Sequence, residues 1–176
     1  MGHHAARRLM ARFRRRVTRT RRGTYQIRLP QGEKDLLENL VTQLRTMLSL
    51  GTNDPALRRL FPTAYHEDAE RDREYQQLVR DELVDRRLAA LTAVEETSAV
   101  QEVTEEQLAH WLTGLNDLRL VLGTRLDVSE DTDGTDGDDD DPDATARSIY
   151  DYLGFLLTEI VDALAEGLPP SVESDI

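Results

Sequence analysis

The strongest constraint on the fold is a leucine-rich segment between residues 104 and 126. Its apolar residues recur every three or four positions, as on one side of an α-helix: Leu108, Trp111, Leu112, Leu115, Leu118, Val121, Leu122 and Leu126. The preceding TEEQ, Thr104 to Gln107, is a capping box and predicts where this helix begins. We therefore expect the helix at the centre of the core. Gly114 in its interior predicts a closely packed neighbouring helix, since glycine is otherwise unfavourable there.

Three further segments carry apolar residues at the same period and predict long helices, over residues 33–50, 67–96 and 144–166. Between the first two, Asp54 and Pro55 suit the N-cap and first position of a short helix. On the 67–96 helix, the side predicted to be buried consists of Tyr75, Leu78, Val79, Leu83, Leu88, Leu91 and Val94.

The first 30 residues have a different pattern. Tyr25, Ile27 and Leu29 alternate with polar residues, and Gly23 precedes them where a turn would fall. This predicts a small β-hairpin with strands over 12–18 and 24–29, leaning on the helices because two strands alone are marginally stable. A disordered basic arm is the alternative. The fold class is thus mainly α, an irregular four-to-five-helix bundle with a small N-terminal β-hairpin.

An acidic segment separates the last two predicted helices. From Arg125 to Tyr150 there are ten acidic residues, and the segment has almost no apolar residues before the last helix. Such a segment cannot bury enough surface to offset its conformational entropy. We predict a disordered linker, whose Asp141 or Asp143 caps the following helix. The predicted organisation is a disordered basic N-terminus over 1–11, a single helical domain over 12–168 that contains the linker 127–143, and a tail over 169–176.

Charge is distributed unevenly along the chain. Residues 1–30 hold ten arginines and no acid, whereas residues 31–176 hold 12 basic and 34 acidic residues, a net charge of −22. Clustered arginines can neutralise phosphates or contact an acidic protein surface, including the chain's own acidic segment. The candidate residues for binding a partner or nucleic acid are Arg12, Arg14, Arg16, Arg19, Arg21, Arg22 and Arg28.

Several kinds of chemistry lack the residues they need. The chain has no cysteine, so disulfides, thiol nucleophiles and cysteine metal sites are excluded. His66 and His110 have the surroundings of surface histidines, and the acidic segment lacks the twelfth-position glutamate of a calcium loop. We therefore predict no cofactor, no metal and no enzymatic activity. There is no apolar run of about 18 residues and no apolar region after the basic N-terminus, which predicts a cytoplasmic protein without a membrane span.

Polar residues inside the central helix need their own explanation. The stretch LNDLRLVLGTRL places Asn116, Asp117, Arg119 and Arg125 among leucines. Arg119 lies next to the apolar stripe, which predicts an ion pair with an acid; a binding surface is the alternative.

Four stretches together resemble the AosR-like family of small actinobacterial, oxidative-stress-responsive regulators, often encoded beside the Clp adaptor ClpS. They are GTYQIRLPQGEKDLL, LENLVTQLRTML, DPALRRLFPTAYHEDAERDREYQQL and WLTGLNDLRLVLGTRLDV. The resemblance implies transcriptional regulation under oxidative stress through protein contacts. Some members sense thiol redox state, which this cysteine-free chain cannot do. The polar positions that match the family are Arg58, Arg59, Asn116, Asp117, Arg119 and Arg125.

We therefore predict a non-enzymatic regulatory protein that acts through protein–protein contacts in transcription or the stress response. Its expected partner belongs to the transcription or proteolysis machinery. The alternative is a nucleic-acid-binding module that uses the arginine-rich hairpin. The apolar stripe of the last helix would suit a homodimer as well as a monomer core.

Overall fold

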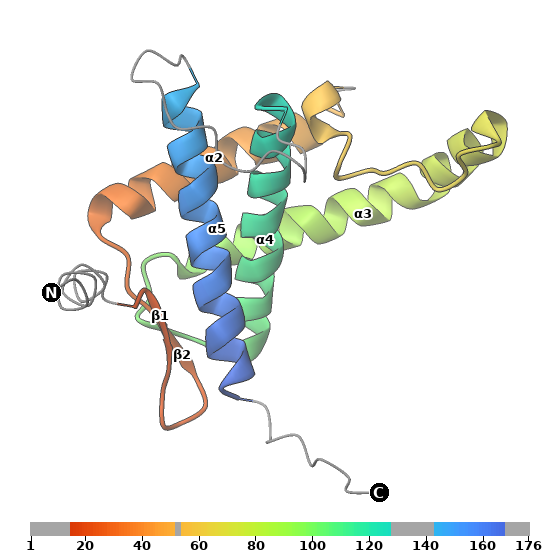
Figure 1. Cartoon of the computed structure of the whole chain (residues 1–176). Helices are drawn as coiled ribbons and strands as arrows, with labels where there is room; N and C mark the ends of the chain where they lie inside the picture. Colours follow the sequence, from red (N-terminus) through yellow and green to blue (C-terminus); the bar gives the residue numbers. More distant parts are fainter. Residues whose placement is uncertain (1–14, 52–53, 128–142, 168–176) are drawn as a thin grey trace, which may run out of the picture.

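The computed structural model describes residues 15–51, 54–127 and 143–167. In chain order these contain β1 (Val17–Arg19), β2 (Tyr25–Ile27), α2 (Gln31–Ser49), the 3-10 helix η1 (Pro55–Leu57), α3 (Ala69–Thr97), β3 (Glu102–Val103), α4 (Glu105–Arg125) and α5 (Ala144–Ala165). The predicted class, a mainly helical bundle with a small N-terminal hairpin, is confirmed (Figure 1).

Helix α4 forms the centre of the bundle, as predicted. It contacts α3 and α5, and Figure 1 shows α5 running antiparallel beside it. The predicted capping box at Thr104 and Gln107 is present. Trp111 is buried and its indole Nε1 donates a hydrogen bond to Thr97 Oγ1 at 2.7 Å. At Gly114 an added Cβ would lie 3.3 Å from Val94 Cγ2, which confirms the close approach of a neighbouring helix.

The hairpin belongs to a three-stranded antiparallel sheet in the order β1-β2-β3. Val17 pairs with Ile27 and Tyr25 with Val103, and these four side chains are buried. Gly23 forms the turn with a φ of 84°. The strands are shorter than predicted, and β3 was not predicted because two residues are too few to show an alternating pattern.

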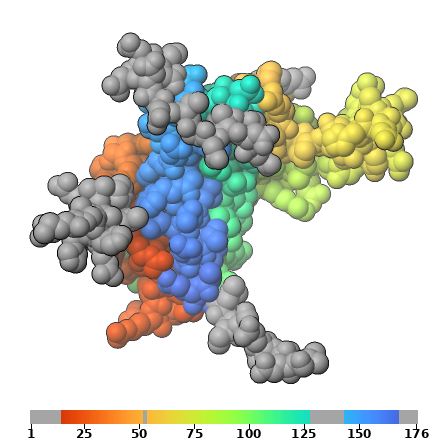
Figure 2. Space-filling view, in the orientation of Figure 1, coloured from red at the N-terminus to blue at the C-terminus, as the bar shows by residue number. Residues whose placement is uncertain are grey.

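Helix α3 differs most from its prediction. Its buried residues all lie in its last eight positions: Ala90, Leu91, Val94 and Thr97. Tyr75 and Leu78, expected to be buried, are 41% and 82% exposed. Figure 1 shows the reason: the first part of α3 extends away from the other helices, so none of the described helices packs against it there. Residues 61–86, which are this part of α3 and the segment folded back along it, are called the arm below; the arm protrudes in Figure 2.

Several predictions concern residues that the structure does not describe. These are the basic N-terminus over 1–11, Arg12 and Arg14, positions 128–142 of the acidic linker, and the tail over 169–176. Asp143 occupies the N-cap position of α5, but its side chain makes no capping hydrogen bond, so the prediction is wrong for Asp143, while its alternative, Asp141, lies outside the described residues. Its backbone, with φ −96° and ψ 2°, is not in the extended conformation that directs a capping side chain to the first turn. None of the helices in the described ranges combines the length and apolar content needed to cross a bilayer.

Candidate functional site

The arm is held together by contacts between its own two segments. The backbone N–H groups of Ala64 and Tyr65 donate to Asp72 Oδ1 at 2.7 and 3.1 Å, and Gln76 Nε2 donates to the Pro62 carbonyl at 2.9 Å. Tyr65 also meets the edge of Tyr75, with ring centroids 5.8 Å apart. Because these contacts are local in sequence, the arm can keep its shape without resting on the bundle.

One face of the arm is apolar at its centre and charged at its edges. Tyr75 and Leu78 are three positions apart and therefore neighbours on the helix surface. Arg71 lies four positions before Tyr75, and Glu82 and Arg86 lie four and eight positions after Leu78. At this spacing all three occupy the same side of α3 as Tyr75 and Leu78. Arg86 and Glu82 form an exposed ion pair. This face can offer apolar contact surrounded by charges of both signs.

A buried ion pair joins the base of the arm to the central helix. Arg87 of α3 donates to the carboxylate of Asp117 in α4, and its NH2 donates to the Leu60 carbonyl at 2.7 Å. The Arg87 side chain also lies 5.6 Å from the centre of the Phe61 ring. Burial raises the pKa of Asp117, and the hydrogen bond from Arg87 offsets only part of that effect.

The sequence contains a signal for this pair that our prediction did not use. Asp117 lies three positions after Gly114 and four before Val121, and both of those residues are buried. An acid on the buried side of a helix requires a buried cation. The prediction that Arg119 forms an ion pair is wrong among the described residues. The ion pair of this stretch is instead formed by Asp117, two positions earlier, with Arg87. The two side chains lie about 200° apart around α4, so Asp117 faces α3 and Arg119 faces α5.

The other residues of the family pattern lie mostly near the C-terminal end of α4. Arg58 is 3.8 Å from the carboxylate of Asp127, and Arg125 is 4.0 Å from that of Asp54. The Arg59 guanidinium lies 3.5 Å from where a Cβ of Gly123 would stand. These arginines thus join the segment around η1 to the end of α4, which is a structural role. Asn116 is exposed.

Arg119 has a different environment from these arginines. Its guanidinium carbon lies 4.2 Å from the centre of the Tyr150 ring, on α5. Its Nε is buried and has no hydrogen-bond partner. None of the ion pairs within the described ranges involves it.

The predicted basic residues of the hairpin divide into two groups. Arg16 is half-buried in an ion pair with Glu33, at 2.7 Å, so its charge is used within the fold. The other four that the structure describes are exposed: Arg19, Arg21, Arg22 and Arg28. We call these four the basic turn. Arg28 donates to Gln26 Oε1 at 2.5 Å, and no carboxylate in the described part of the chain forms an ion pair with the basic turn.

A polar cluster fastens β1 to two helices. The Arg16 guanidinium donates two hydrogen bonds to Glu33 of α2, at 2.7 and 3.0 Å, and the Tyr152 hydroxyl of α5 donates a third at 2.7 Å. Glu159 of α5 accepts from the backbone N–H groups of Arg16 and Val17 at 2.5 and 3.1 Å. This satisfies backbone groups at the start of the strand.

The cluster shifts the pKa values of its members. Partial burial would raise the pKa of Glu33, but the hydrogen bonds from Arg16 and Tyr152 outweigh it, so the pKa is lowered. The hydrogen bond to Glu33 raises the pKa of Arg16. Burial, followed by the hydrogen bond to Glu33, raises the pKa of Tyr152. These shifts favour the ion pair in the folded protein, which fits a structural role.

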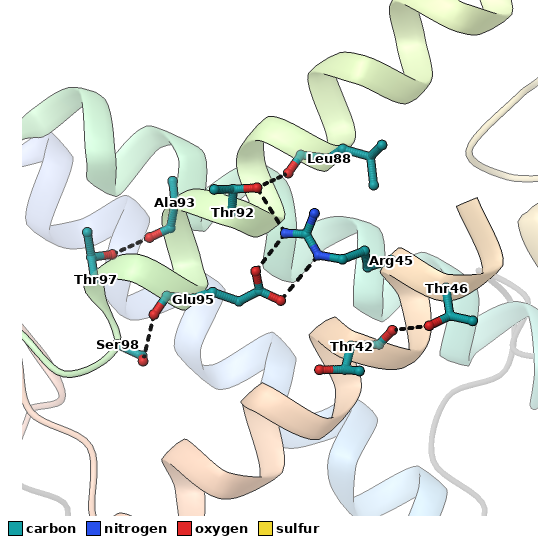
Figure 3. Close-up of polar contacts among 9 residues, drawn as sticks. All are labelled: Thr42, Arg45, Thr46, Leu88, Thr92, Ala93, Glu95, Thr97 and Ser98. Atoms are coloured by element: carbon teal, nitrogen blue, oxygen red, sulfur yellow. Dashed lines mark hydrogen bonds and ion pairs between the residues drawn. The ribbon is translucent and has the colours of Figure 1, made fainter. Parts of the chain in front are cut away.

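The crossing of α2 and α3 is fixed at the inner half of α3 (Figure 3). Arg45 of α2 donates to Thr92 Oγ1 at 2.9 Å and to both carboxylate oxygens of Glu95, at 2.7 and 3.3 Å. Together with the burial of Leu91 and Val94, these contacts anchor the inner half of the helix. The arm therefore begins where this anchoring ends.

Two of the surface hollows on the described part of the molecule involve residues of interest. The larger, about 470 Å³, is lined by Gln26, Ile27, Arg28, Leu29, Lys34, Ala99, Val100 and Gln101. The smaller, about 320 Å³, lies between α4 and α5 and is lined by Arg119, Gly154, Leu157, Thr158 and Val161. Among the residues whose placement is known, no three acids or histidines are grouped as metal ligands.

These features define a class of protein: a helical bundle with a small sheet, a projecting arm, and charged side chains that mostly join one element to another. Comparison with protein-family models matches residues 10–164 to the domain of unknown function DUF2017. The match covers most of the 176-residue chain, which therefore belongs to the DUF2017 family. Comparisons with curated proteins and with solved structures gave no match. The resemblance to AosR-like regulators stays a prediction.

Proposed function

We propose that this protein is a non-enzymatic regulator that binds another protein through its arm. The observation that carries the proposal is the exposure of Leu78, at 82%, on a helix that leaves the bundle. The first 21 residues of α3, up to Ala89, include none that is buried. A partner that binds such a helix buries apolar surface that is still exposed to water, which is favourable, whereas a helix already covered offers little further surface to bury.

The chemistry of the arm favours a protein over nucleic acid. Residues 61–86 contain eight acidic and four basic residues, so their net charge is −4 and they repel phosphates. Tyr75 beside Leu78, with charges of both signs around them, has the composition of a protein interface with an apolar centre and a polar rim. The expected partner surface is an apolar groove that receives one face of a helix.

The resemblance to AosR-like regulators supports a role in transcription or the stress response. It also supports a role in proteolysis, because members are often encoded beside the Clp adaptor ClpS. We expect a cytoplasmic partner from the transcription or proteolysis machinery. Signalling by a thiol is excluded for this chain, which has no cysteine.

Site-specific photo-cross-linking in cells tests the proposal. A photoreactive phenylalanine replaces Leu78 in one variant and Leu50 in the control, since Leu50 is another highly exposed leucine, at 70%, at the end of α2. We expect a discrete adduct from position 78 but not from position 50, and its loss when Tyr75 is also changed to alanine. Mass spectrometry of the adduct then identifies the partner. Equal adducts at both positions, or none at position 78, would contradict docking by the arm.

A second candidate function is nucleic-acid binding by the basic turn. Its four exposed arginines form no ion pairs with described carboxylates. The two arginines that precede the basic turn do have partners: Arg15 pairs with Glu166 and Arg16 with Glu33. The test is a mobility-shift titration at several salt concentrations. If both arginines contact phosphate, the Arg21→Ala/Arg22→Ala variant should reduce the slope of log K against log salt by about 1.8. The Arg71→Ala/Arg73→Ala variant removes two charges from the arm and should leave the slope unchanged. Absence of a shift at low salt would exclude this function.

A further inference from the structure

The larger surface hollow lies where strands β2 and β3 separate. The two strands form only two residue pairs, and the pair on the side of the hollow is Gln26 with Glu102. Beyond it, residues 27–29 line one side of the hollow and residues 99–101 the other. Its volume, about 470 Å³, falls within the range of about 300–1,000 Å³ that small-molecule sites occupy. The hollow can therefore receive a small ligand.

Two cations line this hollow, and no acid does. Arg28 donates to Gln26 Oε1 but forms no ion pair in the described part of the chain. Lys34, the only lysine of the chain, is partly buried, and its ammonium group takes part in none of the hydrogen bonds or ion pairs found for the described residues. The remaining lining residues have carboxamide or apolar side chains: Gln26, Gln101, Ile27, Leu29, Ala99 and Val100. The fold thus leaves two positive charges of the hollow without a counter-charge.

The acids near this hollow are engaged elsewhere. Four acids flank its lining residues in the sequence, and none of them lines it: Glu33, Asp35, Glu38 and Glu102. Each accepts a hydrogen bond from a residue outside the hollow, in this order: Arg16, Gln31, Ser98 and Thr24. More distant acids are screened, because the Debye length is about 8 Å at physiological ionic strength. The net charge of −12 therefore does not prevent an anion from binding in the hollow.

We propose that this hollow binds a small anion with two or more negative charges, carried by phosphate or carboxylate groups. The planar guanidinium of Arg28 can donate two hydrogen bonds to one such group, and Lys34 supplies a second positive charge. The amide nitrogens of Gln26 and Gln101 can donate further hydrogen bonds. Val100, 43% exposed, offers apolar surface to an uncharged part of the ligand.

The hollow is distinct from both binding surfaces described above. It includes no residue of the arm, so this inference is independent of the proposed function. It shares Arg28 with the basic turn, but its second cation, Lys34, belongs to α2. A nucleic acid would follow charges spread along open surface. A small anion, in contrast, can place its charged groups within one hollow.

Isothermal titration calorimetry of the full chain with pyrophosphate and with citrate tests the inference. We expect saturable binding of at least one of the two, with a Kd of about 1 mM or below. Comparison of the two anions shows whether phosphate or carboxylate groups are preferred. Lys34→Gln and Arg28→Gln should each weaken binding at least about tenfold, because each removes a charge-assisted contact. Arg22→Gln, which removes an equal charge outside the hollow, should change the Kd by less than about threefold.

A second pair of variants adds a charge instead of removing one. Val100→Glu places a carboxylate at the hollow and should abolish binding by repelling the anion. Val161→Glu is the matched control, since it makes the same change at an exposed valine of α5, at 51%, and should leave binding unchanged. Circular dichroism of each variant checks that the fold is intact.

Chemical acetylation reports on the site directly, because Lys34 is the only lysine. The bound anion should slow the acetylation of Lys34, measured by mass spectrometry, while the α-amino group of the same molecule reacts at an unchanged rate. Three results would each overturn the inference: no saturable binding of either anion, equal weakening by Arg22→Gln and Lys34→Gln, or acetylation of Lys34 at the same rate with and without the bound anion.

Discussion

Replacing Asp117 by alanine should remove a large part of the protein's stability. The side chains of Asp117 and Arg87 are 2% and 18% exposed, so the change leaves a largely buried guanidinium without its counter-charge. Breaking one side of a buried ion pair costs about 3–5 kcal/mol of unfolding free energy. We expect about 3 kcal/mol, the lower end, because Arg87 keeps its 2.7 Å hydrogen bond to the Leu60 carbonyl and its contact with Phe61.

Urea unfolding followed by far-UV circular dichroism at neutral pH measures this loss. The matched control is Glu82→Ala, which removes an acid from an exposed pair with Arg86 on the same helix. An exposed pair of this kind contributes about 0.3–0.5 kcal/mol. The control should therefore unfold close to the original protein.

A double variant separates an uncompensated charge from a general packing defect. Arg87→Met with Asp117→Leu removes both charges and keeps apolar bulk at both positions. It should recover most of the loss, since replacing a buried pair by apolar groups is often neutral or stabilising. A loss below about 1 kcal/mol for Asp117→Ala, or a double variant as unstable as the sum of the two single changes, would refute the reasoning.

Three further predictions concern single positions. The pKa of Glu33 is lowered from 4.5, so the folded state binds fewer protons there than the unfolded chain does. The contribution of Glu33 to stability is therefore present above about pH 4.5 and is lost as the pH falls. In urea titrations between about pH 6 and 3, the unfolding free energy of Glu33→Gln should fall less than that of the original protein. Thr97→Val leaves the Trp111 indole N–H without its acceptor and should cost about 1–3 kcal/mol in chemical unfolding. Gly51→Ala should cost about 1–2 kcal/mol, because φ is 59° there, whereas Gly32→Ala inside α2, in equally open space, should stabilise by up to about 1 kcal/mol; equal effects of the two changes in thermal unfolding would contradict this.

The helices and their ends were predictable because their signals are local. The apolar period between residues 104 and 126 marked α4 as the central helix, and the capping box at Thr104 marked where it begins. Gly114 indicated a close neighbour, since only close packing explains a glycine at the centre of a stable helix. Each of these signals lies within one or two helical turns of the residue it concerns.

The arm was not predictable from the same kind of signal. Periodicity shows which side of a helix is more apolar, but it does not show whether another element lies against that side. Leu78 and Leu91 lie 13 positions apart and about 140° apart around α3, and Leu91 is buried against the bundle whereas Leu78 is not. The difference arises from where α2 and α4 cross α3, which depends on the whole chain.

The polar contacts of the candidate surfaces were also beyond local reasoning. Arg87 and Asp117 are 30 positions apart, and acids are so frequent in this chain that each arginine has many plausible partners. The arginines near the N-terminus looked alike in the sequence, but Glu33 pairs with Arg16 and leaves the basic turn exposed. Only the packed arrangement distinguishes a charge used within the fold from one that faces solvent.

Hydrogen exchange along α3 tests most directly the claim that its outer part is a projecting arm without core contacts. Amides of residues 69–86 should exchange through local opening at low free energy, whereas those of residues 90–97, which hold all the buried positions of the helix, should approach the protection of α4. Binding of the partner captured at Leu78 should slow the outer amides selectively. Uniform strong protection along all of α3 in the free monomer would contradict the claim, because it would require a neighbour that covers the arm.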